Sequence, residues 1–410
     1  MENSNSSIKN KIMAFFRDSI WSISALVLIN VVAQFIVYPF CNRAFGDEIY
    51  GDILYAMSII TVPAVSIGVS ANYSRMRESS QGETVNGDYN TVLLVCGILT
   101  GIVTYVLLRL SGRRMSSEEQ ILGAILSVFT MWRYYADVEY RLSLNYRRYF
   151  VYYAIIAGGY FVGILLFRAT RLWPLALLPG EIAGLVFVIL TGNLFTKDPF
   201  RRSPRFRNNI NVIMVLVASN LISNIIFNGD RLTLELVIGG TAVTIYYLAS
   251  LVGKTMSLIT TPLNSVIIGY LSRFQGNITR KHVHIFAMAT LGAIRLSTAV
   301  CVVGSHILLP ILYPASYAGV VEFIIIASGT QVIYFVTNIV TTVLLRISQV
   351  RAQLIINVCY AICFAGLCIP GAKIYGVKGF CVALFLTNTI RYLVGIFLCY
   401  RGQKKLALQG

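Results

Sequence analysis

The chain has 410 residues, of which 56% are hydrophobic and only 12% are charged, with a formal net charge of +17. Soluble proteins carry about 25% charged residues, so this composition excludes an ordinary soluble globular protein and indicates an integral membrane protein. The positive charge is typical of membrane proteins, whose Lys and Arg residues gather on the cytoplasmic side, and we expect no nucleic acid partner.

Twelve apolar stretches are long enough to cross a membrane, which takes about 20 mostly apolar residues. The sequence therefore predicts an all-α integral membrane protein with about twelve transmembrane helices. The first stretch is too long for a cleavable signal and lacks an A-x-A-like site, so we expect it to be retained. The predicted spans are 19–40, 51–70, 90–110, 119–140, 149–167, 172–194, 210–228, 241–271, 284–312, 319–345, 352–371 and 377–400.

The distribution of Lys and Arg predicts which side each loop faces. With both termini in the cytoplasm, 21 of the 34 fall on the inner side, nine on the outer side and four inside spans. This excess supports cytoplasmic termini. The segment "TKDPFRRSPRFRNN" (196–209, the basic segment) is rich in Arg and Pro, and we interpret it as a cytoplasmic linker. It separates an N-terminal six-helix lobe (1–195) from a C-terminal six-helix lobe (210–410).

Polar side chains recur at helical spacing on four predicted spans, where lipid contact would be costly. They are Asn30, Gln34 and Tyr38 on the first span, Tyr55, Ser58 and Ser66 on the second, Asn220, Asn224, Asn228 and Arg231 on or just after the seventh, and Tyr247, Ser250, Lys254, Ser257, Thr261 and Ser265 on the eighth. Within each span these side chains are about three or four residues apart, or a multiple of that, which places them on one face of the helix. Two explanations stay open, helix–helix hydrogen bonding in a packed bundle and a water-filled central cavity. We favour the cavity.

Three cations lie well inside predicted spans: Lys254, Arg295 and Arg391. Each would cost about 2.5–3.5 kcal/mol on an insertion scale if it faced lipid. We expect them to face the protein interior, where they would favour an anionic solute that carries phosphate. For each of them, a structural ion pair or snorkelling toward the membrane surface is the alternative.

Acidic residues inside the spans are few. Arg133 and Asp137 are four residues apart in the fourth span, which predicts an ion pair between them. Glu181, directly after Pro179 and Gly180, is then the main carboxylate outside a pair. It is our candidate for coupling transport to a proton or sodium gradient. The alternative is that its carboxyl hydrogen-bonds backbone groups freed by the Pro–Gly break.

The sequence contains no pattern of a catalytic or metal site. There is no CxxC, no Cys/His cluster with zinc spacing, no GxSxG and no phosphate-binding loop. We therefore expect no enzyme activity, no catalytic residue, no metal and no cofactor. A membrane glycosyltransferase or polymerase could use the adjacent acids Asp47 and Glu48, but such enzymes need a sizeable outer domain, and every predicted outer loop is short.

Four segments together resemble a known family. They are "CNRAFGDEIYGDILYAMS" (41–58), "NGDRLTLELVIGGTAVTIYYLAS" (228–250), "LYPASY" (312–317) and "IYGVKGFCVA" (374–383). Their order over nearly the whole chain resembles the polysaccharide or O-antigen flippase family of the multidrug/oligosaccharidyl-lipid/polysaccharide exporter (MOP) superfamily. No one of these segments is as specific as a Walker A motif.

The resemblance implies a fold and a function. The fold is two six-helix lobes around a central cavity lined by helices 1, 2, 7 and 8. The function is translocation of undecaprenyl-diphosphate-linked oligosaccharide units across the bacterial cytoplasmic membrane for O-antigen, capsule or exopolysaccharide synthesis. Polymerase and chain-length proteins would be its pathway partners. The motif charges Arg43 and Asp230, with the adjacent Arg231, would lie at the outer mouth.

A multidrug or cation antiporter of the same superfamily is the alternative function. Such a transporter needs acidic groups in its cavity to bind cationic drugs and coupling ions. The first span carries no acid near its middle, only Asp18 at its start. The sequence therefore favours the flippase.

Overall fold

The computed structural model describes residues 2–79, 85–112, 114–258, 260, 264, 267, 279–347 and 351–409. These residues are almost entirely helical, and no β-strand occurs among them. The all-α fold predicted from composition is therefore confirmed.

The chain forms two compact units, Met1–Asp230 (unit 1) and Arg231–Gly410 (unit 2). The boundary between them falls later than the basic segment, because helix α8 (Phe206–Phe227) packs against α2 (Tyr38–Ser79) of unit 1. The division into six-helix lobes on either side of the basic segment stays a prediction.

Unit 1 begins with α1 (Glu2–Val32), which continues through a short π-helical segment, η1 (Ala33–Val37), into α2. Within α2 the helix is interrupted at Gly46, which has φ 78° and ψ 176°. This conformation is essentially restricted to glycine. The turn expected between the first two predicted spans therefore lies at Gly46.

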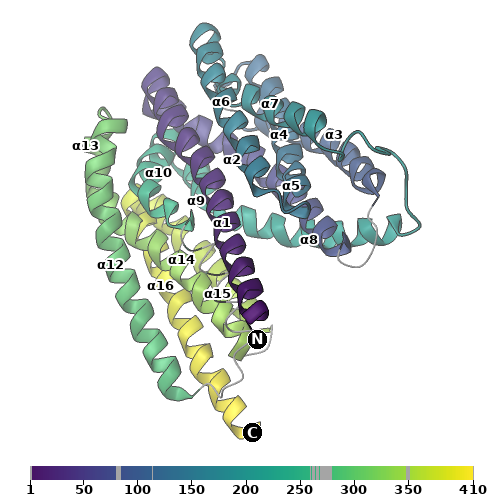
Figure 1. The fold of residues 1–410 in the computed structure, drawn as a ribbon. Coiled ribbons are helices and arrows are strands. Elements are labelled where there is room, and N and C mark those ends of the chain that lie inside the picture. The colour runs from purple at the N-terminus through teal and green to yellow at the C-terminus, as the bar shows by residue number, and fades with distance from the viewer. Residues whose placement is uncertain are drawn as a thin grey trace. The chain divides into compact units, whose positions relative to one another are not determined.

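Helix α4 contacts several other helices of unit 1. This helix starts at a capping box in which the Ser116 hydroxyl and the Glu119 carboxylate each accept a backbone N–H from the other residue. It packs against α2, α3 and α7, while α6 packs against α1 and α7 (Figure 1). These elements are α3 (Asn86–Leu110), α4 (Ser117–Ala136), α5 (Val138–Leu142), α6 (Tyr146–Thr170), η2 (Trp173–Ala176) and α7 (Leu178–Thr191). Helix α9 (Gly229–Val237), which follows α8, contains the boundary between the two units.

The basic segment is held against the first turn of α3. Asp88 accepts hydrogen bonds from the Ser203 backbone N–H at 2.8 Å, from the Ser203 hydroxyl at 2.5 Å and from the Asn209 amide at 2.9 Å. The backbones approach so closely that a Cβ atom at Gly87 would overlap the carbonyl oxygen of Arg201. The segment that we interpret as a linker therefore has a defined conformation.

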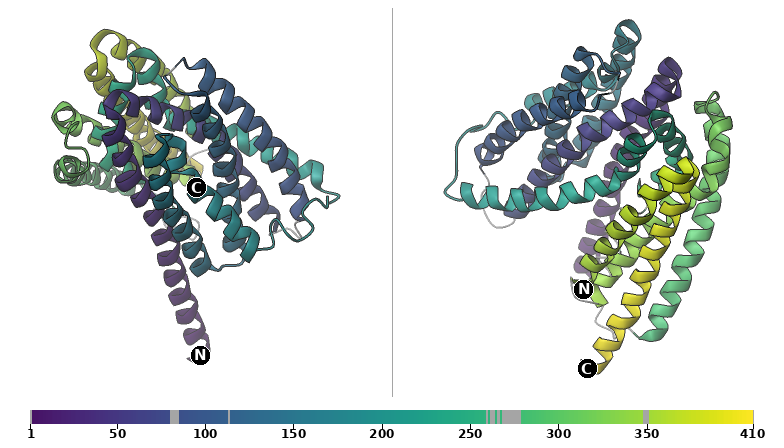
Figure 2. Two further views of the ribbon diagram at one scale, coloured as in Figure 1. Left: turned by 90° about the horizontal axis from the view of Figure 1, so that it is seen from above. Right: turned by 180° about the vertical axis from the view of Figure 1, so that it is seen from behind.

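Unit 2 is organised around α14, which packs against α10, α12 and α16 (Figure 2). Val332, Val336 and Val340 recur every four residues along α14 and pack with Ile356 of α15 and Tyr392 of α16. The elements of this unit are α10 (Gly240–Thr255), α12 (Arg280–Leu312), α13 (Tyr317–Val320), η3 (Val321–Phe323), α14 (Ile324–Ile347), α15 (Arg351–Cys363), η4 (Phe364–Cys368) and α16 (Ile369–Gln409).

Seven helices of the described residues are long and apolar enough to cross a membrane, judged by length and composition. Two of them, Arg17–Ser79 and Ile355–Gln403, each contain two predicted spans. These pairs are separated at Gly46 and at Gly376, which has φ 61° and ψ −147°. The fourth and sixth predicted spans correspond to α4 and α7. Much of the eighth span beyond α10 lies outside the described residues.

Candidate functional site

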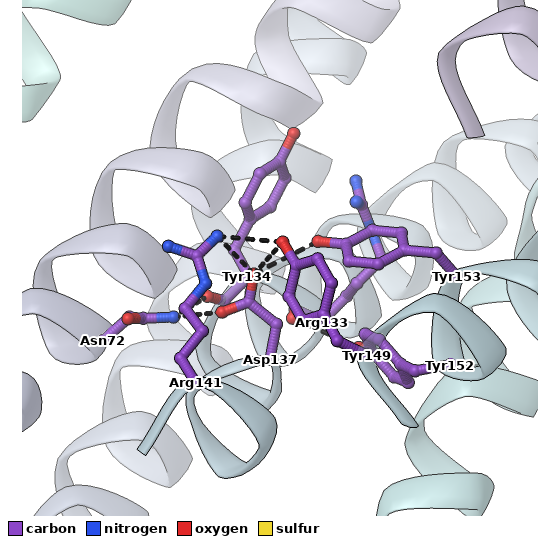
Figure 3. Close-up of polar contacts among 8 residues, drawn as sticks. All are labelled: Asn72, Arg133, Tyr134, Asp137, Arg141, Tyr149, Tyr152 and Tyr153. Atoms are coloured by element: carbon purple, nitrogen blue, oxygen red, sulfur yellow. Dashed lines mark hydrogen bonds and ion pairs between the residues drawn. The ribbon is translucent and has the colours of Figure 1, made fainter. Parts of the chain in front are cut away.

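A buried cluster of polar side chains lies where α4 ends. Asp137 is the C-cap residue of α4 and is 2% exposed. Its carboxylate accepts hydrogen bonds from Arg141 at 2.9 Å, from the Tyr149 hydroxyl at 3.3 Å and from the Tyr153 hydroxyl at 3.2 Å (Figure 3). The Asn72 amide of α2 also donates to it. This carboxylate therefore joins α2, α4, α5 and α6.

Arg133 does not pair with Asp137, so that prediction was wrong. The Arg133 Nε atom lies 2.7 Å from the Glu181 carboxylate of α7. The spacing of four residues misleads here because α4 ends at Ala136, which lets Asp137 turn toward Arg141 and the α6 tyrosines.

Glu181 was expected to lie outside an ion pair, but it is paired with Arg133. Besides Arg133, it accepts a hydrogen bond from the Tyr160 hydroxyl at 2.9 Å. It lies in the first turn of α7, where the helix dipole favours a negative charge. Gly180 permits this geometry, since a Cβ atom there would overlap Tyr160 and the Ile156 backbone. A role for Glu181 in coupling stays a prediction, and it now requires the ion pair to open.

The polar stripes of α2 and α8 contact one another. The Asn224 amide donates to the Ser66 hydroxyl at 3.1 Å, and the Asn220 amide donates to the Ser70 hydroxyl at 2.8 Å. The helix–helix hydrogen bonding left open from the sequence thus accounts for these side chains. Elsewhere in unit 1 the stripe residues bond within their own helix or are buried: Asn30 donates to the Leu26 carbonyl, Gln34 donates to Asn30, and Tyr55 is 8% exposed.

Lys254 lies in the last turn of α10, where the helix dipole favours a cation. It is buried, and its ammonium lies 5.6 Å from the centre of the Tyr247 ring. The Arg231 guanidinium lies 4.8 Å from the centre of the same ring. Two residues predicted at separate depths, Arg231 at the outer mouth and Lys254 in the interior, thus converge on one aromatic side chain. Ser257 donates its hydroxyl to the Lys254 carbonyl at 2.9 Å.

The other two predicted interior cations, Arg295 and Arg391, lie on different helices of unit 2 from Lys254. Arg295 is exposed on α12, and Arg43 is exposed in unit 1, where Asp230 is buried. Arg391 is buried on α16 and donates to the Asn338 side-chain oxygen at 3.0 Å. Roles for all of them in substrate binding stay predictions.

A polar stripe on α14 was missed from the sequence. Tyr334, Asn338 and Thr342 follow one another at four-residue steps, and the first two contact Arg391. The same test of helical spacing that identified the stripe on the eighth span would have found this one.

No known protein-family profile matches the chain, and no curated protein sequence matches it. Solved structures do match. An inward-facing multidrug resistance MATE family transporter of the MOP superfamily is 13% identical with a TM-score of 0.69, over 94% of this chain and 99% of that one. Its outward-facing counterpart is 14% identical with a TM-score of 0.62, over 96% of each. The Vibrio cholerae MATE transporter VcmN in the bent form is 13% identical with a TM-score of 0.61, over 98% and 99%.

These matches concern the fold. The matched proteins are transporters rather than enzymes, and their architecture of about twelve helices in two lobes confirms the predicted fold class. The chain is therefore a multi-pass membrane protein with the fold of the MATE transporters of the MOP superfamily.

Proposed function

We propose that this protein translocates an undecaprenyl-diphosphate-linked oligosaccharide across the bacterial cytoplasmic membrane. The observation that supports this function is the convergence of Arg231 and Lys254 on the Tyr247 ring, at 4.8 and 5.6 Å from its centre. Two cations held near one aromatic side chain favour an anionic group between or beside them, because a charge-assisted contact to phosphate is about twice as strong as a neutral one.

The charge balance of the two units supports the same substrate class. Unit 2 contains 14 Lys and Arg residues but only two acids, Glu235 and Glu322. In unit 1 the buried carboxylates of Asp137 and Glu181 each have an arginine partner, which neutralises them. Unit 2 as a whole thus carries an excess of positive charge, which favours an anionic solute.

A multidrug antiporter is the second candidate. Two of the matched structures are described as multidrug resistance MATE family transporters, which favours it. At 13–14% identity, however, the likeness concerns the fold, and one fold hosts many functions. Asp137 and Glu181 would have to release their arginine partners before either could bind a cationic drug or a coupling ion.

Reconstitution separates the two candidates. The purified protein would be placed in liposomes with a fluorescent, short-chain polyprenyl-diphosphate-linked oligosaccharide, and dithionite would report which leaflet holds the fluorophore. We expect translocation above that of protein-free liposomes, with or without an imposed proton or sodium gradient. Gradient-driven movement of ethidium without any lipid translocation would instead establish the antiporter.

Variants of Lys254 test its contact with the diphosphate. A charge-assisted contact contributes about 1.5–3 kcal/mol, so Lys254→Ala should lower the translocation rate about ten- to a hundredfold. Lys254→Arg should retain much of the rate, and Lys254→Glu should be slowest because it repels phosphate. Lys281→Ala, at an exposed position on α12, is the matched control. Normal rates for both Lys254→Ala and Lys254→Glu would remove the lysine from the proposal.

A further inference from the structure

Arg391 is a buried cation with an incomplete set of partners. It is 7% exposed, and its Nη2 atom donates to the Asn338 side-chain oxygen at 3.0 Å. Among the described residues, its Nε and Nη1 atoms have no hydrogen-bond acceptor, and none of the ion pairs there includes it. Two nitrogens of the guanidinium therefore carry N–H groups, one on Nε and two on Nη1, whose acceptors are not supplied by that part of the chain.

Aromatic rings recover part of the cost of burying this charge. The Arg391 guanidinium carbon lies 4.7 Å from the centre of the Tyr334 ring and 5.4 Å from that of Tyr360. Cation–π contacts are weaker than the cost of taking an ion out of water, even after the protein relaxes, so they leave a deficit. An anion beside the guanidinium would offset it.

The geometry of the surrounding groups suits a tetrahedral oxyanion. A guanidinium offers its donors in a planar fork that matches phosphate oxygens. Because Asn338 accepts through its oxygen, its side-chain nitrogen is left as a further donor on the same face of α14. Tyr334 and Asn338 of α14 are half-buried, whereas Arg391 of α16 is buried. The α14 side chains therefore form the more accessible part of the site, and Arg391 forms its inner part.

We infer that Arg391 and Asn338 bind a phosphate group within the helices α14, α15 and α16 of unit 2. This site lies on different helices from Lys254 and the Tyr247 ring, which belong to α10. The phosphate could come from a lipid-linked diphosphate, a source that rests on the proposed function, or from free inorganic phosphate or pyrophosphate. The recognition chemistry is the same for both.

Binding to the full-length protein in detergent tests the site. Radiolabelled pyrophosphate and farnesyl diphosphate are the probes, and farnesol is the control for the lipid chain. We expect wild-type protein to bind at least one of the two phosphate probes and not farnesol. Arg391→Gln should weaken that binding about ten- to a hundredfold. Arg401→Gln, at an exposed position on the same helix α16, should bind as wild type does.

Loss of binding by Arg391→Gln would also follow if that variant failed to fold, so Asn338→Asp provides a second test. It changes the shape of the side chain very little and places a carboxylate beside Arg391. The carboxylate should form an ion pair with the guanidinium. We expect this variant to unfold at a higher temperature than wild type and to lose phosphate binding. Both results together support an anion site, since a purely structural arginine would gain stability without any change in ligand binding.

The outcomes separate the inference from the proposed function. Pyrophosphate binding that depends on Arg391 supports the site even if no lipid-linked glycan is translocated, and farnesyl diphosphate binding alone supports the lipid as its source. If wild-type protein binds neither pyrophosphate nor farnesyl diphosphate, the site is overturned. Binding that Arg391→Gln and Asn338→Asp both leave unchanged also overturns it, even if liposomes show full translocation.

Discussion

Arg133 and Glu181 join α4 to α7 through an ion pair in which both side chains are largely buried. Replacing one partner leaves an uncompensated charge, which costs about 3–5 kcal/mol in known buried pairs. We therefore expect Glu181→Gln to lower the free energy of unfolding by about that amount, measured as a lower thermal unfolding temperature in detergent. Glu118→Gln, at an exposed position in the first turn of α4, should have little effect.

The double variant Arg133→Gln/Glu181→Gln distinguishes structure from coupling. Because it removes both charges, it should lose less stability than the two single variants summed. If it also translocates substrate at the wild-type rate under an imposed gradient, Glu181 has only a structural role. Equal stability of Glu181→Gln and Glu118→Gln would show that the ion pair does not form.

The first turn of α3 holds the basic segment in place through backbone contact and hydrogen bonds to Asp88. Gly87→Ala should displace this segment, because its methyl group would overlap the Arg201 carbonyl. The exposed arginines of the segment are trypsin sites, and local opening exposes them to the protease. We expect trypsin to cleave Gly87→Ala about ten times faster than wild type in membranes where the segment is accessible.

Two further variants check that the contact itself is responsible. Asp88→Ala should give faster cleavage too, since it removes three hydrogen bonds of about 0.5–1.5 kcal/mol each. Gly158→Ala is the matched control, because nothing lies within 4 Å of a Cβ atom at that position on α6. Cleavage of Gly87→Ala at the wild-type rate would mean that the segment is not held by α3.

For the whole molecule, the charge distribution predicts an orientation in the membrane. Arg207 lies in the first turn of α8, at the end of α3 where the basic segment is held, and Arg114 follows the other end of α3. Twenty-five residues of helix separate these ends, which is enough to cross a bilayer. We expect Arg207→Cys to react with an impermeant maleimide only in inside-out vesicles, and Arg114→Cys to react in intact cells.

Wild-type protein provides the background in that experiment, since it has eight cysteines of its own. Labelling is read as the signal above this background. Reaction of Arg207→Cys in intact cells at the level of Arg114→Cys would contradict cytoplasmic termini and the inner location of the basic segment.

Composition and helical spacing by themselves determined the class of this protein. Apolar length is a local property, because each spanning helix must satisfy its backbone hydrogen bonds internally and present apolar side chains to lipid. The helices, the turns near Gly46 and Gly376 and the all-α fold were accordingly predictable. So was the presence of Lys254 on a polar face, since that depends only on the spacing within one helix.

Only the tertiary structure decided which polar groups meet. Glu181 pairs with Arg133 because α7 packs against α4 and because α4 ends before Asp137. The spacing of four residues between Arg133 and Asp137 reveals neither of these facts. Asn224 of α8 meets Ser66 of α2 across 158 positions of sequence. Such partners depend on the approach of helices distant in the chain, and a helical repeat reports only the face that a side chain occupies.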